Sequence, residues 1–153
     1  MARLDRMSVQ ERESFLNRPC PSFDATPWVV GPPLKDMKIA LISTAGVHRR
    51  SDRPFTPAAI DYRLIPADTP SSELVMSHTS TNFDRTGFQQ DWNVVFPLDR
   101  LRELAEVGEI GQVAQYHYAF MGATDPDALE PRARELGQIM RVEGVDAALL
   151  VPV

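Results

Sequence analysis

Cysteine is almost absent from this chain of 153 residues. The single cysteine, Cys20, excludes a disulfide within the chain and a zinc site built from cysteines. It stands between Pro19 and Pro21 in an expected loop, with no histidine or basic cluster beside it to activate the thiol. We therefore expect Cys20 to be a structurally neutral thiol.

Positive charge and long apolar runs are also scarce. The chain has 16 lysine and arginine residues against 21 aspartate and glutamate residues, which leaves no basic surface for nucleic acid. No apolar run approaches the roughly 18 residues of a membrane span. The N-terminus lacks the apolar stretch of a secretory signal. The sequence thus predicts a cytoplasmic protein without nucleic-acid or membrane partners.

Two further absences concern binding sites. The sequence has no Gly-x-Gly-x-x-Gly pattern and no Walker lysine, so a nucleotide fingerprint is missing. No His-x-x-x-His or similar spacing is present, and we expect no metal site.

Continuous apolar runs at residues 38–44 and 145–151 are the clearest strand signals. Apolarity that does not alternate indicates burial on both faces, as in a parallel sheet. Shorter strand candidates are residues 62–66, 73–77 and 93–96. The second long run leads only to Pro152 and Val153, although the loop after such a strand is where α/β proteins carry reacting groups. Either this strand closes the fold, or the part that performs the chemistry is missing.

Two helices are predicted to cover this sheet. Leucines recur at helical spacing after Pro97, whose fixed φ suits a first helical turn, and they predict a helix over residues 97–107. An apolar face over residues 131–143 predicts a second helix that ends at Gly144. Asp125-Pro126 is a pair typical of a helix start, but Pro131 indicates that the regular helix begins nearer Glu130. The expected fold is a three-layer α/β domain with a mostly parallel sheet, flavodoxin-like or related.

The first 36 residues form an N-terminal arm ahead of the α/β domain of residues 37–153. Ser8, followed three residues later by Glu11, is a capping-box pattern that predicts a short helix over residues 8–17. The rest of the arm is too rich in proline for regular structure and too apolar for disorder. Its apolar residues include Phe23, Trp28, Val29 and Val30. We expect them to pack over the domain, or over a second subunit in a homo-oligomer.

The loop after residues 38–44 is the first candidate site. It lies at the carboxyl end of an expected parallel strand, where α/β proteins bind ligands. A hydroxyl, backbone N–H groups and basic side chains follow one another here, and guanidinium groups suit a carboxylate or phosphate. The expected binding residues for a small anionic substrate are Thr44, Gly46, His48, Arg49 and Arg50. The alternative is a solvated basic loop held by Asp52.

The polar segment of residues 77–93, which also carries Phe and Trp, is the second candidate site. His78 with Asp84 or Asp91 could form an acid–base pair. We expect catalytic roles for His78 and Asp84, and substrate binding by Asp91. The alternative is an ordered loop whose Asp and Asn side chains cap turns. The remaining histidine, His117, lies between two tyrosines and is interpreted as packing rather than catalysis.

A family resemblance comes from the order of several segments. The polar residues 77–93 precede Val-Val-Phe-Pro-Leu-Asp-Arg-Leu-Arg-Glu-Leu at 94–104 and Gly-Glu-Ile-Gly at 108–111. In this order the segments resemble the selenoprotein B family of glycine, sarcosine, betaine and D-proline reductases. Residues 38–53 and 144–153 also fit its short bacterial members. The reductase subunits proper are much longer than this chain.

The resemblance implies a reductase whose redox centre is a selenocysteine or cysteine, closely followed by a cysteine, just after a strand such as residues 147–153. In short bacterial members that centre is expected after a Pro-Val pair, and this chain ends at Pro152-Val153. The resemblance thus implies a selenoprotein cut at its UGA codon, catalytically incomplete as given, with a thiol protein as electron donor. The alternative is a complete, non-catalytic ligand-binding or interaction domain.

Overall fold

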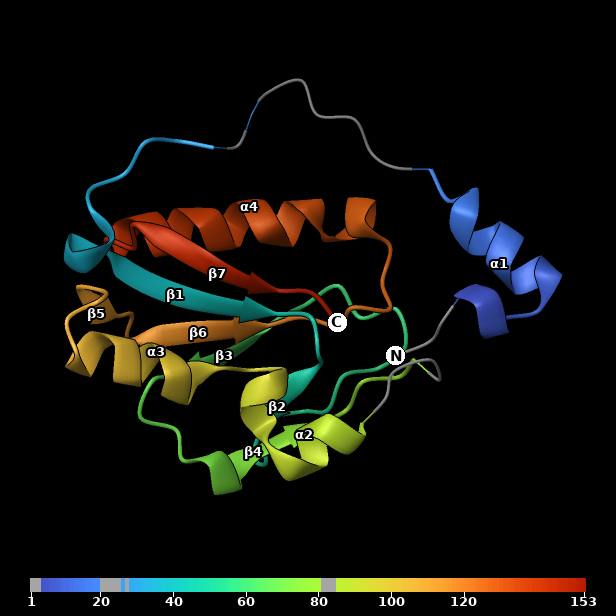
Figure 1. The fold of residues 1–153 in the computed structure, drawn as a ribbon, viewed down its shortest axis with the longest axis horizontal. Coiled ribbons are helices and arrows are strands. Elements are labelled where there is room, and N and C mark those ends of the chain that lie inside the picture. Colours follow the sequence, from blue (N-terminus) through green and yellow to red (C-terminus); the bar gives the residue numbers. More distant parts are fainter. Residues whose placement is uncertain (1–3, 20–25, 27, 81–84) are drawn as a thin grey trace.

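A computed structural model describes residues 4–19, 26, 28–80 and 85–153, and it has an α/β architecture (Figure 1). The strands are β1 (Lys38–Ser43), β2 (Val47–Arg49), β3 (Arg63–Pro66), β4 (Leu74–Met76), β5 (Gln112–Val113), β6 (Tyr116–Ala119) and β7 (Ala147–Val151). The α-helices are α1 (Val9–Leu16), α2 (Thr86–Gln90), α3 (Leu98–Glu106) and α4 (Pro126–Val142). Short 3₁₀ helices are η1 (Leu4–Arg6), η2 (Leu34–Asp36), η3 (Ser71–Glu73) and η4 (Trp92–Val94).

β1 is the central strand of the main sheet and runs parallel to β5, β6 and β7. β7 pairs with it on one side, from Ile39 opposite Ala147 to Ser43 opposite Val151. β5 and β6 follow each other on the other side, and β3 pairs antiparallel with β6. The predicted α/β class is confirmed, as is the parallel pairing of the two long apolar strands. The sheet is mixed because of β3, so the predicted flavodoxin-like arrangement is not confirmed.

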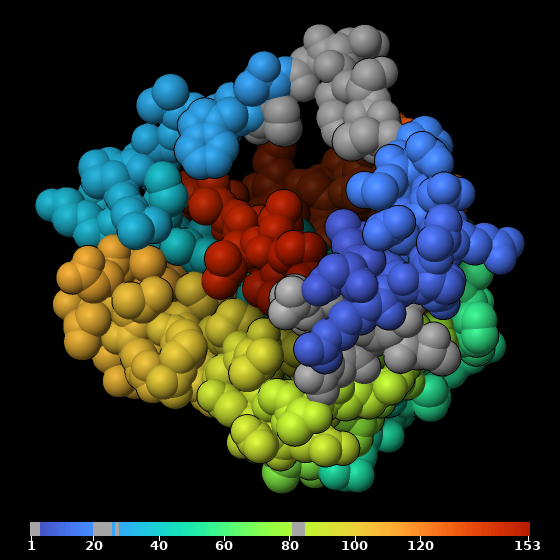
Figure 2. Space-filling view, turned by 45° about the vertical axis from the view of Figure 1, so that its right-hand side comes forward, coloured from blue at the N-terminus to red at the C-terminus, as the bar shows by residue number. Residues whose placement is uncertain are grey.

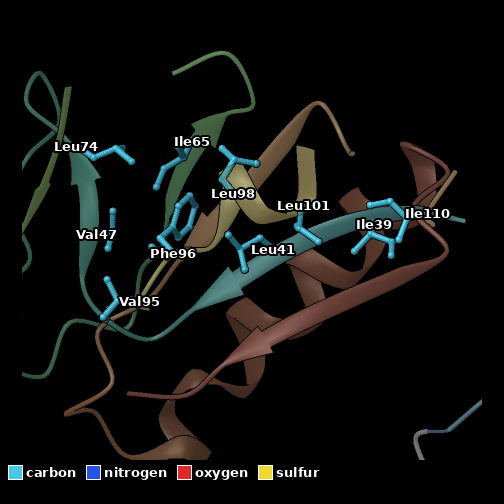
Figure 3. Packing of buried hydrophobic residues seen from close by; sticks show 12 residues of the cluster. Ile39, Leu41, Val47, Ile65, Leu74, Val95, Phe96, Leu98, Leu101 and Ile110 are labelled. Carbon is cyan, nitrogen blue, oxygen red and sulfur yellow. The ribbon is translucent and has the colours of Figure 1, made fainter. Parts of the chain in front are cut away.

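Different helices cover the two faces of β1. Because side chains alternate across a strand, Ile39 and Leu41 share one face, where they join a buried cluster with Leu101 of α3 (Figure 3). Ile42 belongs to the other face and packs in a second cluster with Leu136 of α4. This packing on both faces fixes where the carboxyl end of β1 lies.

β2 and β4 form a separate antiparallel ribbon that starts just beyond β1. Val47 lies opposite Met76 in this ribbon. Val47 and Leu74 belong to the same buried cluster as β1, so the ribbon packs against the main sheet. β3 and β4 confirm the strands predicted at residues 62–66 and 73–77.

Two predicted elements are wrong. Residues 93–96 are not a strand, because the Asp91 carboxylate accepts a bond from the backbone N–H two residues on (2.9 Å) and caps η4. α4 begins at Pro126, well before the predicted start, because the Asp125 side chain caps it there. The helix continues through Pro131, which lacks the N–H of one helical hydrogen bond.

Other helix ends follow their local signals. The Ser8 hydroxyl accepts a bond from the Glu11 backbone N–H (3.3 Å), and the Glu11 carboxylate accepts one from the Ser8 backbone N–H (3.1 Å). Just beyond α4, Gly144 has a φ of +69°, in the left-handed region that glycine favours. The capping box and the closing glycine are both confirmed.

Three apolar residues of the N-terminal arm, Trp28, Val29 and Val30, are exposed. Trp28, Val29 and Val30 are 84%, 77% and 98% exposed, and α1, which lies away from the main sheet in Figure 1, buries no residue. The expectation that these three side chains pack over the domain is therefore wrong, whereas packing against a second subunit stays a prediction. Cys20 and Phe23 lie outside the described residues.

β7 forms one edge of the main sheet. The prediction that both of its faces are buried is wrong. Leu149 and Leu150 are exposed, Leu150 by 66%. The reason is that, among the described residues, β7 pairs only with β1. Figure 2 shows this C-terminal segment, in red, at the surface. An apolar edge strand is a place where another strand can pair.

Candidate functional site

Three segments meet at the carboxyl end of β1. They are residues 44–46 after β1, residues 121–122 after β6 and the segment after β7 that ends at Val153. The backbone N–H of Gly122 donates to the carbonyl oxygen of Thr44 (2.8 Å). Because β1, β6 and β7 are parallel, these segments share the sheet edge at which α/β proteins carry ligands.

Thr44 holds the last residue of the sequence by its side chain. Its Oγ1 accepts a bond from the backbone N–H of Val153 (2.8 Å) and donates to the carbonyl oxygen of Val153 (3.3 Å). The backbone N–H of Thr44 donates to the carbonyl oxygen of Val151 (3.1 Å). The hydroxyl predicted to bind a ligand thus makes two hydrogen bonds within the protein.

Gly122, which no sequence motif marks, lies on the other side of Val153. A Cβ at this position would come within 2.5 Å of the Val153 carbonyl oxygen and 2.7 Å of the Thr44 carbonyl oxygen. Both atoms are backbone, so only glycine fits without moving the chain. The available signal was its position shortly after β6, which leads to the same sheet edge.

Gly46 brings the second predicted loop against the first. Its φ is +67°, and a Cβ would lie 3.1 Å from the backbone nitrogen of His78. The Gly46 carbonyl oxygen accepts a bond from Ser77 N–H (3.0 Å), while the Gly46 N–H donates to the Phe120 carbonyl oxygen (2.9 Å). The structure therefore places Gly46 and His78 together, close to Thr44, and the Gly46 amide is bonded within the protein.

His78 is buried, with 6% of its surface exposed. Its Nδ1 accepts a bond from Ser80 N–H (3.2 Å), and its carbonyl oxygen accepts one from Nη2 of Arg85 (2.6 Å). Burial, and secondly the charge of Arg85, lowers the pKa of His78 below its usual value. The imidazole is therefore neutral at pH 7, with its proton on Nε2.

Arg49 of the first candidate site is held by a neighbour. It donates from Nε and Nη2 to the two carboxylate oxygens of Asp52 (3.2 and 2.8 Å), as in the alternative interpretation of this loop. His48 is buried, with Nδ1 2.8 Å from the Arg49 carbonyl oxygen. Arg50 is exposed, and its Nε donates to the Ser72 carbonyl oxygen (3.3 Å). Of these three residues, Arg50 is thus the one most open to solvent at its side chain.

Of the two acidic residues predicted for the site, the structure describes Asp91 but not Asp84. Asp91 accepts bonds from the backbone N–H and Nδ2 of Asn93 (2.9 and 3.0 Å), and these bonds lower the pKa of its carboxyl group. Asn93 in turn caps α3, because its Oδ1 accepts a bond from Asp99 N–H (3.1 Å). Asp84 lies outside the described residues, so its pairing with His78 stays a prediction.

His117 completes the hydrogen bonding of the main sheet. β1 pairs with β5 at Ile39 and with β6 at Ile42, and between them the Leu41 N–H donates to Nδ1 of His117 (3.0 Å). The ring is fully buried, and its Nε2 has no hydrogen-bond partner among the described residues. Burial, with a smaller effect of the Arg102 charge, lowers the pKa of His117 to about 4. These contacts agree with packing rather than catalysis.

Two negative findings apply to the described ranges only. No group of three or more His, Cys, Asp or Glu side chains in them could hold a metal ion. None of their helices has both the length and the apolar character needed to cross a membrane.

Comparison with known proteins gives the family of the chain. The family described as glycine/sarcosine/betaine reductase selenoprotein B (GRDB) matches residues 9–153. The chain belongs to the selenoprotein B family. The match includes every segment that meets at the carboxyl end of β1, and it confirms the resemblance inferred from residues 38–153.

Two curated relatives of the selenoprotein B chain are subunits of reductases. The D-proline reductase subunit gamma of Acetoanaerobium sticklandii is 36% identical over 120 residues, which cover 76% of this chain and 49% of that protein. The glycine reductase complex component B subunit gamma of Symbiobacterium thermophilum is 31% identical over 140 residues, covering 86% of this chain and 32% of that protein. The chain thus spans half or less of these relatives. No solved structure matches it.

Proposed function

We propose that this chain forms the part of a selenoprotein B reductase that presents the nucleophile and substrate at the carboxyl edge of its main sheet. The observation that supports this best is the meeting of Thr44, Gly122 and Val153 at that edge, with His78 against Gly46. Reacting groups of α/β proteins are carried at this edge. Reductase chemistry is proposed because the family and both relatives are named for it.

The proposed redox centre is a selenocysteine or cysteine directly after Val153, with a second cysteine nearby. Such a pair supplies two electrons and two protons to the substrate and becomes a selenenyl sulfide or disulfide, which a dithiol donor protein reduces again. The residues present suit this group in one respect. Thr44 bonds the backbone of Val153, and Gly122 leaves the space that Val153 occupies, so a residue attached to Val153 starts from a defined position.

The proposed substrate is a small molecule with an anionic group. The relatives are named for D-proline and glycine, and both of these carry a carboxylate. The exposed guanidinium of Arg50 suits a carboxylate. We further propose that His78, neutral at pH 7, exchanges protons with the substrate together with Asp84.

The proposed partners follow from the same relatives. Both are named as subunits, one of them of a complex, which supports protein partners for this chain. We propose a thiol protein as electron donor and a second copy of the chain as a further partner. The exposed Trp28, Val29 and Val30 support the second copy, because large apolar side chains of this kind are usually covered.

A second candidate function is a non-catalytic ligand-binding or interaction domain. The observation that favours it is the exposed apolar surface of β7 and of residues 28–30, where another protein chain can pair or pack.

Turnover assays discriminate between the two functions. We expect no thiol-dependent reduction of glycine, sarcosine, betaine or D-proline by the 153-residue chain. A form extended past Val153 by the genomic reading frame, with selenocysteine or cysteine at the next position, should reduce at least one of them with a dithiol as donor when it is assayed together with its partner subunits. Turnover by the chain that ends at Val153, or none by the extended form in its complex, would contradict the reductase proposal.

A further inference from the structure

At the end of the pairing between β1 and β7, side-chain hydrogen bonds of Thr44 take the place of backbone hydrogen bonds. The last residue pair of the ladder is Ser43 opposite Val151. One step further, the Thr44 N–H still donates to the Val151 carbonyl oxygen (3.1 Å). Beyond that point the Thr44 hydroxyl replaces the backbone, since it bonds both the N–H and the carbonyl oxygen of Val153 (2.8 and 3.3 Å). The Thr44 side chain thus keeps the chain after β7 hydrogen-bonded to the main sheet as far as Val153.

Gly122 closes the other side of this arrangement. Its N–H donates to the Thr44 carbonyl oxygen (2.8 Å), so the loop after β6 is joined to the loop after β1. A Cβ at Gly122 would meet the Val153 carbonyl oxygen at 2.5 Å and the Thr44 Cβ at 3.0 Å. The Val153 side chain, in turn, packs against the buried cluster of β1. Val153 is therefore bonded to Thr44, packed on the buried cluster and closely flanked by Gly122.

We infer that Thr44 is a positioning residue for the redox residue after Val153, and that Gly122 provides the space this positioning requires. This inference rests on the proposed function, because that function places the nucleophile directly after Val153. Thr44 acts through the backbone of Val153 and not on the substrate. Its role is to give the nucleophile a single starting position, which a frayed strand end would not provide.

The clamp itself is tested by the Val153 amide, independently of any redox chemistry. Thr44→Val keeps the shape of the side chain but removes the hydroxyl, and Thr44→Ser keeps the hydroxyl. In the extended form, hydrogen exchange of the Val153 amide should be about tenfold faster in Thr44→Val and unchanged in Thr44→Ser, since the variant loses the bond that protects this amide. Unchanged exchange at Leu41 would show that the sheet is intact. Equal Val153 exchange in all three proteins would overturn the inference.

Positioning of the nucleophile is tested by the pH profile of its alkylation in the same proteins. Thr44→Val should lower the alkylation rate of the residue after Val153 by about fivefold or more, or shift the pH at which this rate rises. Thr44→Ser should have the rate and the pH profile of the parent. The rate at Cys20 should be the same in all forms. If the residue after Val153 reacts fast and its rate and pH profile are the same in Thr44→Val as in the parent, the positioning role is overturned. If that residue reacts no faster than Cys20 in the unsubstituted protein, the proposed function is overturned instead. Gly122→Ala should speed up hydrogen exchange of the Val153 amide, as Thr44→Val does.

Discussion

Substitution of His117 should show that this residue stabilises the main sheet as a neutral hydrogen-bond acceptor. The Leu41 N–H donates to Nδ1 of this fully buried ring, so protonation at Nδ1 would abolish the hydrogen bond and place a charge in the core. His117→Asn provides a carbonyl oxygen close to the position of Nδ1 and cannot titrate. His117→Phe leaves the Leu41 N–H without an acceptor.

The magnitude follows from the pKa of His117, which burial lowers from 6.5 to about 4. The folded state therefore binds fewer protons than the unfolded state between these two values, and the free energy of unfolding falls as the pH falls through this range. From pH 7 to pH 4.5 the loss due to this residue is about 2 kcal/mol. It is complete below about pH 4 and absent well above pH 6.5.

The assay is urea unfolding of the parent and the two variants at pH 7 and pH 4.5, followed by tryptophan fluorescence. The pH-dependent loss should be smaller by about 2 kcal/mol in His117→Asn, because all other titrating groups are shared with the parent. His117→Phe should cost about 1–3 kcal/mol at pH 7, since it orphans a buried N–H. The same pH dependence in parent and His117→Asn, within about 0.5 kcal/mol, would refute the assigned role.

Three further changes test the fold around the site. Gly46→Ala should lower the free energy of unfolding by about 1–3 kcal/mol because of its φ of +67°, whereas Gly137→Ala, in the open interior of α4, should be neutral or stabilising; calorimetry compares the two. Asn93→Ala should cost about 1 kcal/mol in urea unfolding, because the Asp99 N–H loses its cap. Leu150→Lys on β7 should reduce self-association in light scattering. At a protein concentration where the parent is monomeric, the thermal midpoint should not change because Leu150 is 66% exposed, and a fall in the midpoint there would contradict that exposure.

Local signals predicted much of the fold because local physics decides those features. The apolar run of β1, the Ser8–Glu11 capping box and the left-handed Gly144 each depend on a few neighbouring residues. Predictions were wrong where two local signals point to different helix ends. Pro131 suggested the start of a helix, but the Asp125 cap lies earlier in the chain and sets the true start of α4. The turn at residues 92–94 is likewise set by a cap, the Asp91 side chain.

Features that depend on register could not be predicted from the sequence. His117 owes its role to the gap between β5 and β6 opposite Leu41, and that gap exists only once the sheet is assembled. Gly122 is required because Val153, which is distant in the sequence, passes beside it. The approach of Gly46 to His78 also depends on register, because it follows from the antiparallel pairing of β2 with β4 in a ribbon separate from the main sheet.

The most direct test of the central claim is the rate of alkylation, mapped by mass spectrometry, in the extended form at pH 7. A selenolate is already ionised at this pH, whereas an ordinary thiol with a pKa of about 8.5 is only a few per cent thiolate. The account predicts that the residue directly after Val153 is labelled within a brief exposure while Cys20 remains almost unlabelled. Preferential labelling of Cys20 would contradict the account and favour a non-catalytic binding domain.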